Sequence, residues 1–172
     1  MQPIIDFFNH PFFICVGGVM TAIAVISFII TLLIVAKGII PVWYRLGMGL
    51  AKRKIAILAD AQSQDLKDLL IDSKLFNEKN IFQVNNESLK KAESATMILV
   101  HWKPFESRLD EILSIKKDSD ALIIYAPQKE GFINDEEMTK LSSQRNTIIV
   151  NFRGRLLNDI YTSMITTSYA KG

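Results

Sequence analysis

Thirty consecutive residues without a formal charge, Phe7 to Ala36, constrain this chain more than any other feature of its sequence. A helix rises about 1.5 Å per residue, so about 20 apolar residues cross the hydrocarbon core of a bilayer. We therefore predict one transmembrane helix at residues 12–36, within an N-terminal segment of residues 1–37. A cleaved signal peptide is the alternative, but Asp6 stands where a basic stretch would be, and no A-x-A-like site follows the apolar run.

The distribution of basic residues predicts the orientation of this helix. None precedes it, whereas five follow it closely: Lys37, Arg45, Lys52, Arg53 and Lys54. Because cytoplasmic flanks are enriched in Lys and Arg, we expect a single-pass protein of the cell inner membrane, with its N-terminus outside and residues 55–172 in the cytoplasm. The single cysteine, Cys15, lies in the predicted span, so no disulfide is expected in the cytoplasmic part.

Residues 38–54 are predicted to form an interfacial basic linker between the lipid bilayer and the cytoplasmic domain. Gly38 and Pro41 should end the helix, because glycine weakens a helix and proline removes a backbone donor. Trp43 and Tyr44 suit the inner headgroup layer, and the run Lys52–Lys54 should face anionic lipid.

From residue 54 onward, short β-rich runs alternate with helical runs. The expected strands are residues 54–60, 80–85, 96–102, 121–126 and 147–152, and the expected helices are residues 63–76, 87–93, 104–117, 134–144 and 154–168. Ser63 and Asn134 are the predicted N-caps of two helices. The third to fifth strands are continuous apolar runs, typical of strands covered on both faces. Strict alternation predicts a five-stranded parallel, flavodoxin-like (Rossmann-like) three-layer α/β sandwich with strand order 2-1-3-4-5.

Ligands of such sheets bind outside the carboxyl ends of the strands, near the switch point between the first and third strands. The predicted ligand-binding residues at this edge are Asp60, Gln62, Ser63, Asn85, His101, Trp102, Tyr125, Arg153 and Arg155. The two arginines flank the start of the last helix, where guanidinium and backbone N–H groups both favour anions, so the expected ligand bears a phosphate group, as a cyclic or other nucleotide does. Alternatively, the arginines are solvated or pair with Asp159 and other carboxylates, and Trp102 belongs to the core.

The predicted span has one face of small and hydroxyl-bearing residues at three- and four-residue spacing: Gly17, Thr21, Ala24, Ser27 and Thr31. Such residues let membrane helices approach closely and hydrogen-bond, so we expect a homo-oligomer whose associated helices could line a narrow pore. The alternative is that small residues are simply common in membrane spans.

Several function classes lack their sequence signals. Residues 55–172 carry 15 basic and 17 acidic side chains without a basic stripe, so binding to duplex nucleic acid is not expected, and no metal-ligand spacing is present. No Walker motif, glycine-rich dinucleotide motif or G-x-S-x-G elbow occurs. A phospho-accepting receiver domain would end its first, third and fifth strands with an acidic cluster, Asp and Lys, whereas this chain has a lone Asp60, His101 and Arg153.

The expected fold resembles Toll/interleukin-receptor domains, some of which cleave NAD with a glutamate in the helix after the third strand. Glu106 and Glu111 occupy that region here, so the resemblance implies them as catalytic candidates. The whole arrangement also looks like small membrane effectors of prokaryotic antiviral defence that carry a CRISPR-associated Rossmann fold domain, bind cyclic oligonucleotides and permeabilise the membrane. Architecture alone carries both resemblances.

Three functions are therefore expected, in decreasing order of support. The first is an oligomeric antiviral effector that senses a nucleotide signal and perturbs the membrane through its span. The second is a non-enzymatic anchor or assembly subunit that docks a cytoplasmic protein through exposed apolar residues such as Phe132 and Ile133. The third is an NAD-cleaving enzyme, for which Glu106→Ala or Glu111→Ala would remove activity without changing assembly.

Overall fold

In the computed structural model, the chain forms two units, residues 1–45 and residues 46–172. The structure describes the backbone of residues 10–167 and the side chains of residues 10–44, 47 and 52–167. Residues 1–9 of the predicted N-terminal segment, and Ser168 at the end of the last predicted helix, lie outside the described residues.

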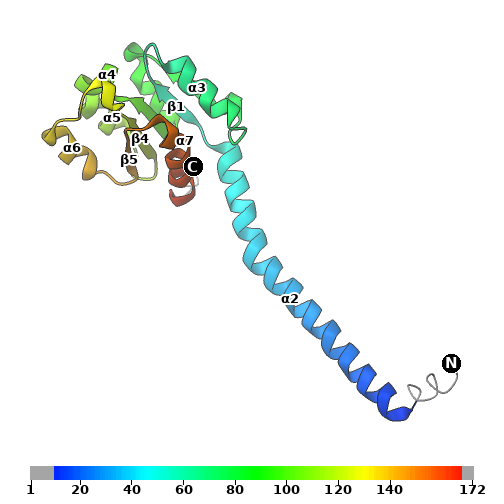
Figure 1. The fold of residues 1–172 in the computed structure, drawn as a ribbon. Helices are drawn as coiled ribbons and strands as arrows, with labels where there is room; N and C mark the ends of the chain where they lie inside the picture. Colours follow the sequence, from blue (N-terminus) through cyan, green and yellow to red (C-terminus); the bar gives the residue numbers. More distant parts are fainter. Residues whose placement is uncertain (1–9, 168–172) are drawn as a thin grey trace. The chain divides into compact units, whose positions relative to one another are not determined.

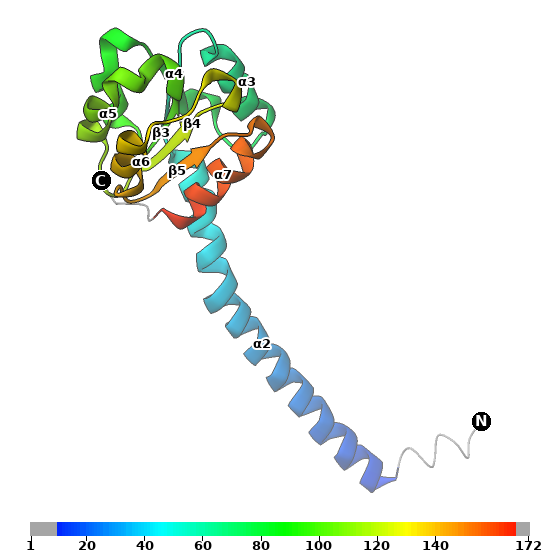
Figure 2. The same ribbon diagram turned by 60° about the vertical axis from the view of Figure 1, so that its left-hand side comes forward.

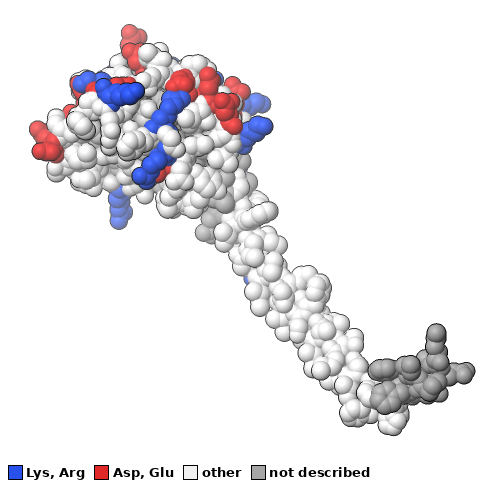
Figure 3. All heavy atoms as spheres, viewed as in Figure 1, with Lys and Arg blue, Asp and Glu red and all other residues white. Residues whose placement is uncertain are grey.

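The N-terminal apolar run forms one long helix, α2 (Pro11–Lys52), of 42 residues. Its residues Pro11–Tyr44 are long and apolar enough to cross a membrane, and Figure 3 draws its surface almost without charged atoms. The predicted break at Gly38 and Pro41 is wrong, because α2 continues through both residues. Proline removes one helical hydrogen bond, but it is tolerated in membrane helices because neighbouring helices, hydroxyl side chains or local 3-10 geometry satisfy the freed carbonyl group.

The rest of the chain forms a five-stranded sheet, as predicted. Its strands are β1 (Ile55–Leu58), β2 (Ile81–Val84), β3 (Met97–His101), β4 (Ala121–Tyr125) and β5 (Thr147–Val150). All pairs are parallel, and the strand order is β2-β1-β3-β4-β5, which confirms the flavodoxin-like arrangement. β3 and β4 are fully buried, but β5 is only half-buried because it is an edge strand, so the prediction of cover on both faces fails there.

Helices cover both faces of this sheet (Figures 1 and 2). The apolar faces of α3 (Ser63–Asp72) and α7 (Arg153–Thr166) pack on one side, through residues such as Leu66, Leu70, Leu156 and Ile160. The other side is covered by η2 (Asn86–Ser94), α4 (Trp102–Phe105), α5 (Leu109–Ile115) and α6 (Asp135–Ser142). Short 3-10 helices, η1 (Glu78–Asn80), η3 (Glu106–Arg108) and η4 (Gln128–Glu130), complete the connections.

Several helices differ from the prediction; α3, for example, ends at Asp72 and not at residue 76. The predicted helix at residues 104–117 is divided into α4, η3 and α5, because Phe105 and Arg108 have non-helical backbone angles. The predicted helix at residues 87–93 is a 3-10 helix interrupted at Ser88. Asn134 caps α6 by accepting from the Glu137 N–H, as predicted, but Gln62 and not Ser63 is the N-cap of α3, and it makes no side-chain capping bond.

Arg53 is buried, so the prediction that the whole run Lys52–Lys54 faces lipid is wrong for its central residue. The guanidinium group of Arg53 donates to the side-chain hydroxyl of Thr167 and to its carbonyl oxygen, the latter at 2.7 Å. A buried cation needs such partners because desolvation is costly. Thr167 directly follows α7, so Arg53 fastens the end of the last helix to the chain between α2 and β1.

Candidate functional site

The carboxyl ends of β3 and β4 bring His101 and Tyr125 together. The two residues are register partners in neighbouring parallel strands, and their ring centroids are 5.9 Å apart. Both are about 5% exposed. Successive strand residues alternate between the faces of a sheet, so His101 shares its face with Met97 and Leu99, which pack in the cluster with α3 and α7.

Glu130, which the sequence analysis did not single out, joins this edge to the start of α3. One carboxylate oxygen lies 2.6 Å from Nε2 of His101, and the other accepts from the side-chain amide of Gln62 at 3.0 Å. If Glu130 is ionised, its carboxylate can only accept, and Nε2 of His101 then carries the hydrogen in this contact. Residues from β3, from η4 and from the turn before α3 therefore form one polar cluster beside the β1–β3 switch point.

The other ring nitrogen of His101 has no partner in the structure. Nδ1 is buried, and no hydrogen bond reaches it. With hydrogen on Nε2, Nδ1 of a neutral ring is an acceptor. Buried polar atoms are nearly always satisfied, so this nitrogen is suited to a donor from a ligand or from water.

Gly131 shapes the loop that places Glu130 over His101. Its backbone angles are φ 111° and ψ 178°, a region that is essentially restricted to glycine. No atom lies within 4 Å of the position that a Cβ would occupy, so the requirement for glycine is conformational and not steric. The loop conformation therefore depends on this residue.

Arg153, the first residue of α7, forms a bidentate ion pair with Asp65 of α3, at 2.5 and 2.8 Å. The hydrogen bond to Asp65 is the main reason that the pKa of Arg153 is raised, and Tyr125 adds to the effect through its charge and a hydrogen bond. Both side chains of the ion pair are about half exposed. Exposed pairs of this kind stabilise a protein by about 0–1 kcal/mol, so an incoming anion can replace Asp65 at small cost.

The structure thus brings together four of the predicted ligand-binding residues, Gln62, His101, Tyr125 and Arg153, with Glu130 and Asp65 as additional members. The remaining five are not joined to this cluster. Asp60 and Asn85 are exposed; Ser63 is half-buried in the first turn of α3; and Arg155 is exposed and lies 3.9 Å from Asp159, the pairing expected in the alternative interpretation.

Trp102 is corrected from a ligand-binding residue to a core residue. It is 3% exposed and packs in the cluster on the α4 and α5 side of the sheet. Trp102 directly follows His101, and consecutive residues at the end of a strand point to opposite faces, so the two cannot serve the same site.

Glu106 and Glu111 both form surface ion pairs. Glu106 accepts from Nζ of Lys103 at 2.9 Å, and Glu111 accepts from Nε of Arg108 at 2.9 Å. Both are i,i+3 contacts between partly exposed side chains. These contacts fit ordinary surface glutamates, and no bond connects either carboxylate to the cluster around His101 within the described residues.

The groove next to Arg153 has a volume of about 440 Å³ and lies between α3 and α7. Its charged lining consists of Arg153 and three aspartates, Asp65, Asp68 and Asp72. An anionic ligand would therefore reach Arg153 from the carboxyl edge and not along the groove, where three carboxylates repel it. Within residues 10–167, no three His, Cys, Asp or Glu side chains gather as a metal site requires.

Sequence signals for the two missed residues exist but are weak. Glu130 lies in the loop after the fourth strand, which must be at the carboxyl edge, and Asp65 lies in the first turn of the helix after the first strand. Neither position reveals its partner in the sequence. The contact of Glu130 with His101 depends on the loop conformation at Gly131, and the contact of Asp65 with Arg153 depends on the spacing of α3 and α7. No family model, curated protein or solved structure matches this chain.

Proposed function

We propose that this protein is a single-span membrane protein whose cytoplasmic α/β domain binds a nucleotide-type ligand at the carboxyl edge and passes the binding event to its membrane helix. This proposal rests mainly on the half-buried cluster of Gln62, Glu130 and His101, in which Nδ1 of the buried His101 has no hydrogen-bond partner among the described residues, beside Arg153 at the start of α7. Open α/β sheets bind ligands at this place.

The groups at this edge suit the two ends of a nucleotide. Arg153 offers a guanidinium fork. No side chain caps the first turn of α7, and the N–H of Arg155 already donates to the carbonyl oxygen of Phe152, so the N–H groups of Arg153 and Gly154 would serve a phosphate. Nδ1 of His101 suits a hydroxyl or amine donor of the sugar or base. Because Glu130 covers His101, binding requires the η4 loop to move, which gives the site two arrangements that a ligand can distinguish.

A continuous set of contacts connects this edge to the membrane helix. Arg153 begins α7, Thr167 follows its last residue, and Thr167 is bound by Arg53, which immediately follows α2. α7 has 14 residues and is therefore about 21 Å long, so a displacement at its first turn is carried to Arg53 as a rigid-body shift.

The topology and assembly in this proposal rest on sequence pattern. Basic residues follow the uncharged run Phe7–Ala36, beginning at Lys37, and none precedes it, which favours a cytoplasmic domain. In the structure, the hydroxyl groups of Thr21 and Thr31 donate to the carbonyl oxygens of Gly17 and Ser27, each at 2.8 Å. Their hydrogen bonds are thus satisfied within the helix, and the small-residue face remains suited to close packing with other copies. Oligomer formation, a pore and an antiviral role stay predictions.

The test is thermal unfolding of the full-length protein in nanodiscs with 1 mM ATP, NAD, cyclic di-AMP or a cyclic oligoadenylate. A ligand at about 100 times its Kd stabilises the folded state by about 2.7 kcal/mol, which raises Tm by roughly 10 °C for a domain of this size. Arg153→Ala should abolish the shift, whereas Arg145→Ala, a change of another exposed arginine, should retain it. Equal shifts in both variants, or no shift with any nucleotide, would contradict the proposal.

The exposed apolar residues favour a second function, docking of a cytoplasmic protein. Phe132 is 84% exposed and Phe152 is 55% exposed, and a hollow of about 230 Å³ along β5 includes Phe152, Ile148 and Ile149. Under this function, Phe132→Ser and Phe152→Ser abolish capture of a partner from the cytoplasm while Arg153→Ala does not. Under the first function, Arg153→Ala abolishes the nucleotide-induced Tm shift, whereas Phe132→Ser and Phe152→Ser retain it.

A further inference from the structure

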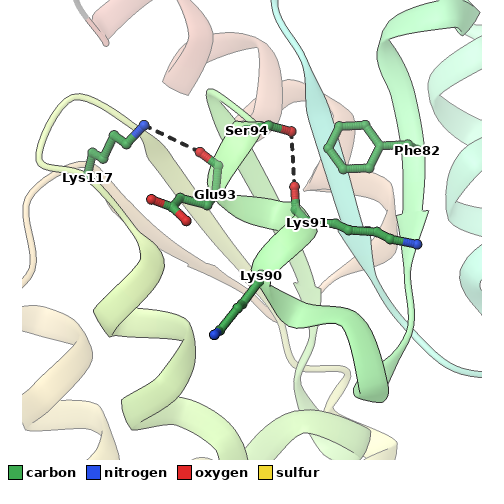
Figure 4. A pocket seen from close by; sticks show the side chains of 6 residues that line it. All are labelled: Phe82, Lys90, Lys91, Glu93, Ser94 and Lys117. Carbon is green, nitrogen blue, oxygen red and sulfur yellow. Dashed lines mark hydrogen bonds between the residues drawn. The ribbon is translucent and has the colours of Figure 1, made fainter.

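We propose that a second surface, at the amino edge of the sheet, binds anionic phospholipid headgroups of the membrane that α2 spans. We call this surface the basic hollow; it is lined by Phe82, Lys90, Lys91, Glu93, Ser94 and Lys117 (Figure 4). The inference requires that α2 spans a membrane with the domain on the cytoplasmic side, but it does not require any ligand at the carboxyl edge.

The basic hollow has cationic groups that the protein itself leaves available. Lys90 and Lys91 are exposed, and neither takes part in the ion pairs found within residues 10–167. Among the described residues, the hydrogen bond of Lys117 Nζ goes to a backbone oxygen, that of Glu93, at 3.4 Å (Figure 4). Three lysines face one glutamate, so the lining has a formal charge of +2. Lysines without internal partners are free to bind external anions.

The fold places the basic hollow at the end of the domain where the membrane helix enters. Ser94, which lines the hollow, is two residues before Thr96. The N–H groups of Thr96 and Met97 both donate to the carbonyl oxygen of Lys54, at 2.9 and 3.2 Å. Lys54 is only two residues beyond the last residue of α2. The hollow and the membrane attachment therefore share the amino edge, opposite the carboxyl edge of the sheet.

The short chain between the span and the domain tethers this edge to the membrane. Phe12 and Trp43 are 31 residues apart, about 46 Å along a helix, which matches the roughly 40–45 Å between the two headgroup layers. Aromatic residues favour those layers. Only eight residues, 45 to 52, separate Tyr44 from Arg53 at the base of the domain, so the domain stays tethered near the leaflet whose headgroup layer Trp43 and Tyr44 favour. The lysines of the basic hollow are attracted to anionic lipid when they come within about one Debye length, roughly 8 Å at physiological ionic strength.

The open form of the hollow favours a bilayer over a soluble phosphate. The hollow is about 530 Å³ in volume and its lysines are exposed, so no buried donor selects one small anion. A single phosphate contacts one or two screened ammonium groups, whereas a leaflet presents an anion to each lysine. Each lysine then raises the docked-to-undocked ratio about five-fold. Tethering by α2 further raises the effective concentration of lipid. The half-buried ring of Phe82 offers an apolar wall toward the glycerol region.

The experiment is hydrogen–deuterium exchange of the full-length protein in nanodiscs of phosphatidylcholine, with or without 30% phosphatidylserine. We expect slower exchange in residues 86–94 and 116–120 only with phosphatidylserine, and a loss of this protection in 0.5 M salt. In Lys90→Gln/Lys91→Gln, the docked-to-undocked ratio should fall about 30-fold. The matched variant Lys103→Gln/Lys129→Gln removes two exposed lysines at the carboxyl edge and should behave as the wild type.

Three outcomes would overturn the proposal: equal protection in discs of phosphatidylcholine alone, retained protection in Lys90→Gln/Lys91→Gln, or the same protection when inorganic phosphate is added to neutral discs. The last result would assign the hollow to a soluble anion. Protease protection of the N-terminal segment in the same discs reports the orientation of α2, and the nucleotide-induced Tm shift reports the carboxyl edge. Failure of the lipid site is thereby distinguished from failure of the proposed function.

Discussion

Replacement of Glu130 by alanine is the most informative single change, because this carboxylate holds two partners at once. It accepts from His101 Nε2 at 2.6 Å and from the Gln62 amide at 3.0 Å. Hydrogen bonds to a charged group contribute about 1.5–3 kcal/mol, and the His101 side chain, only 6% exposed, would be left with an unpaired buried donor. Glu130 itself is 27% exposed, so water compensates in part, and we expect a loss of about 2–3 kcal/mol.

The assay is urea unfolding of the full-length protein in mild detergent, followed by tryptophan fluorescence. The chain has two tryptophans, and Trp43→Phe would leave the buried Trp102, next to His101, as the reporter. Gln62→Ala, which removes the longer and more exposed contact, should cost about 0.5–1 kcal/mol. His101→Phe in the Glu130→Ala background removes the unpaired donor. The double variant should therefore be about 1–2 kcal/mol more stable to unfolding than the sum of the two single losses predicts. A loss below about 0.5 kcal/mol in Glu130→Ala, or strict additivity, would refute the reasoning.

Three further changes test other parts of the structure. Gly131→Ala should destabilise the domain by about 1–3 kcal/mol through backbone strain alone, and it should release Glu130 from His101; an unchanged midpoint in urea would show that the loop adopts another conformation. Arg53→Met should cost about 2–4 kcal/mol in the same assay and Thr167→Val only about 1 kcal/mol, because the carbonyl contact survives the second change; equal effects would contradict the assigned contacts. Gly17→Leu should reduce cross-linking between copies in nanodiscs, while Ile26→Leu on the opposite helix face should not, and equal cross-linking in both would exclude that face as an interface.

The sheet was predictable from sequence because its signals are local and redundant. Apart from the residue that ends each strand, the apolar runs that form β3 and β4 have no polar side chains to face water, so both strands had to be buried. Because strands alternate strictly with helices, only a few sheet topologies are compatible with the sequence. The asparagine cap of α6 was predicted for a similar reason: a side chain reaches its own backbone without help from distant residues.

The predictions that were wrong or missing concern residues whose structure depends on distant parts of the chain or on the surrounding medium. Proline often ends a helix, but α2 continues through Pro41, which lies in an apolar stretch of the chain. Lys52 and Arg53 look equivalent in sequence, yet Arg53 is buried because the end of α7 supplies hydroxyl and carbonyl acceptors. Glu130 became a site residue through the unusual backbone of Gly131, which no periodicity reveals.

Photo-cross-linking tests the central claim most directly. Full-length protein in nanodiscs would be irradiated with 8-azido-ATP or with an azido analogue of cyclic di-AMP, and the modified peptides would be mapped by mass spectrometry. We predict modification within residues 60–65, 125–131 and 151–155, competed by the unmodified nucleotide and lost in Arg153→Ala but not in Arg145→Ala. Labelling elsewhere, labelling that resists competition, or equal labelling of both variants would contradict a nucleotide site at the carboxyl edge.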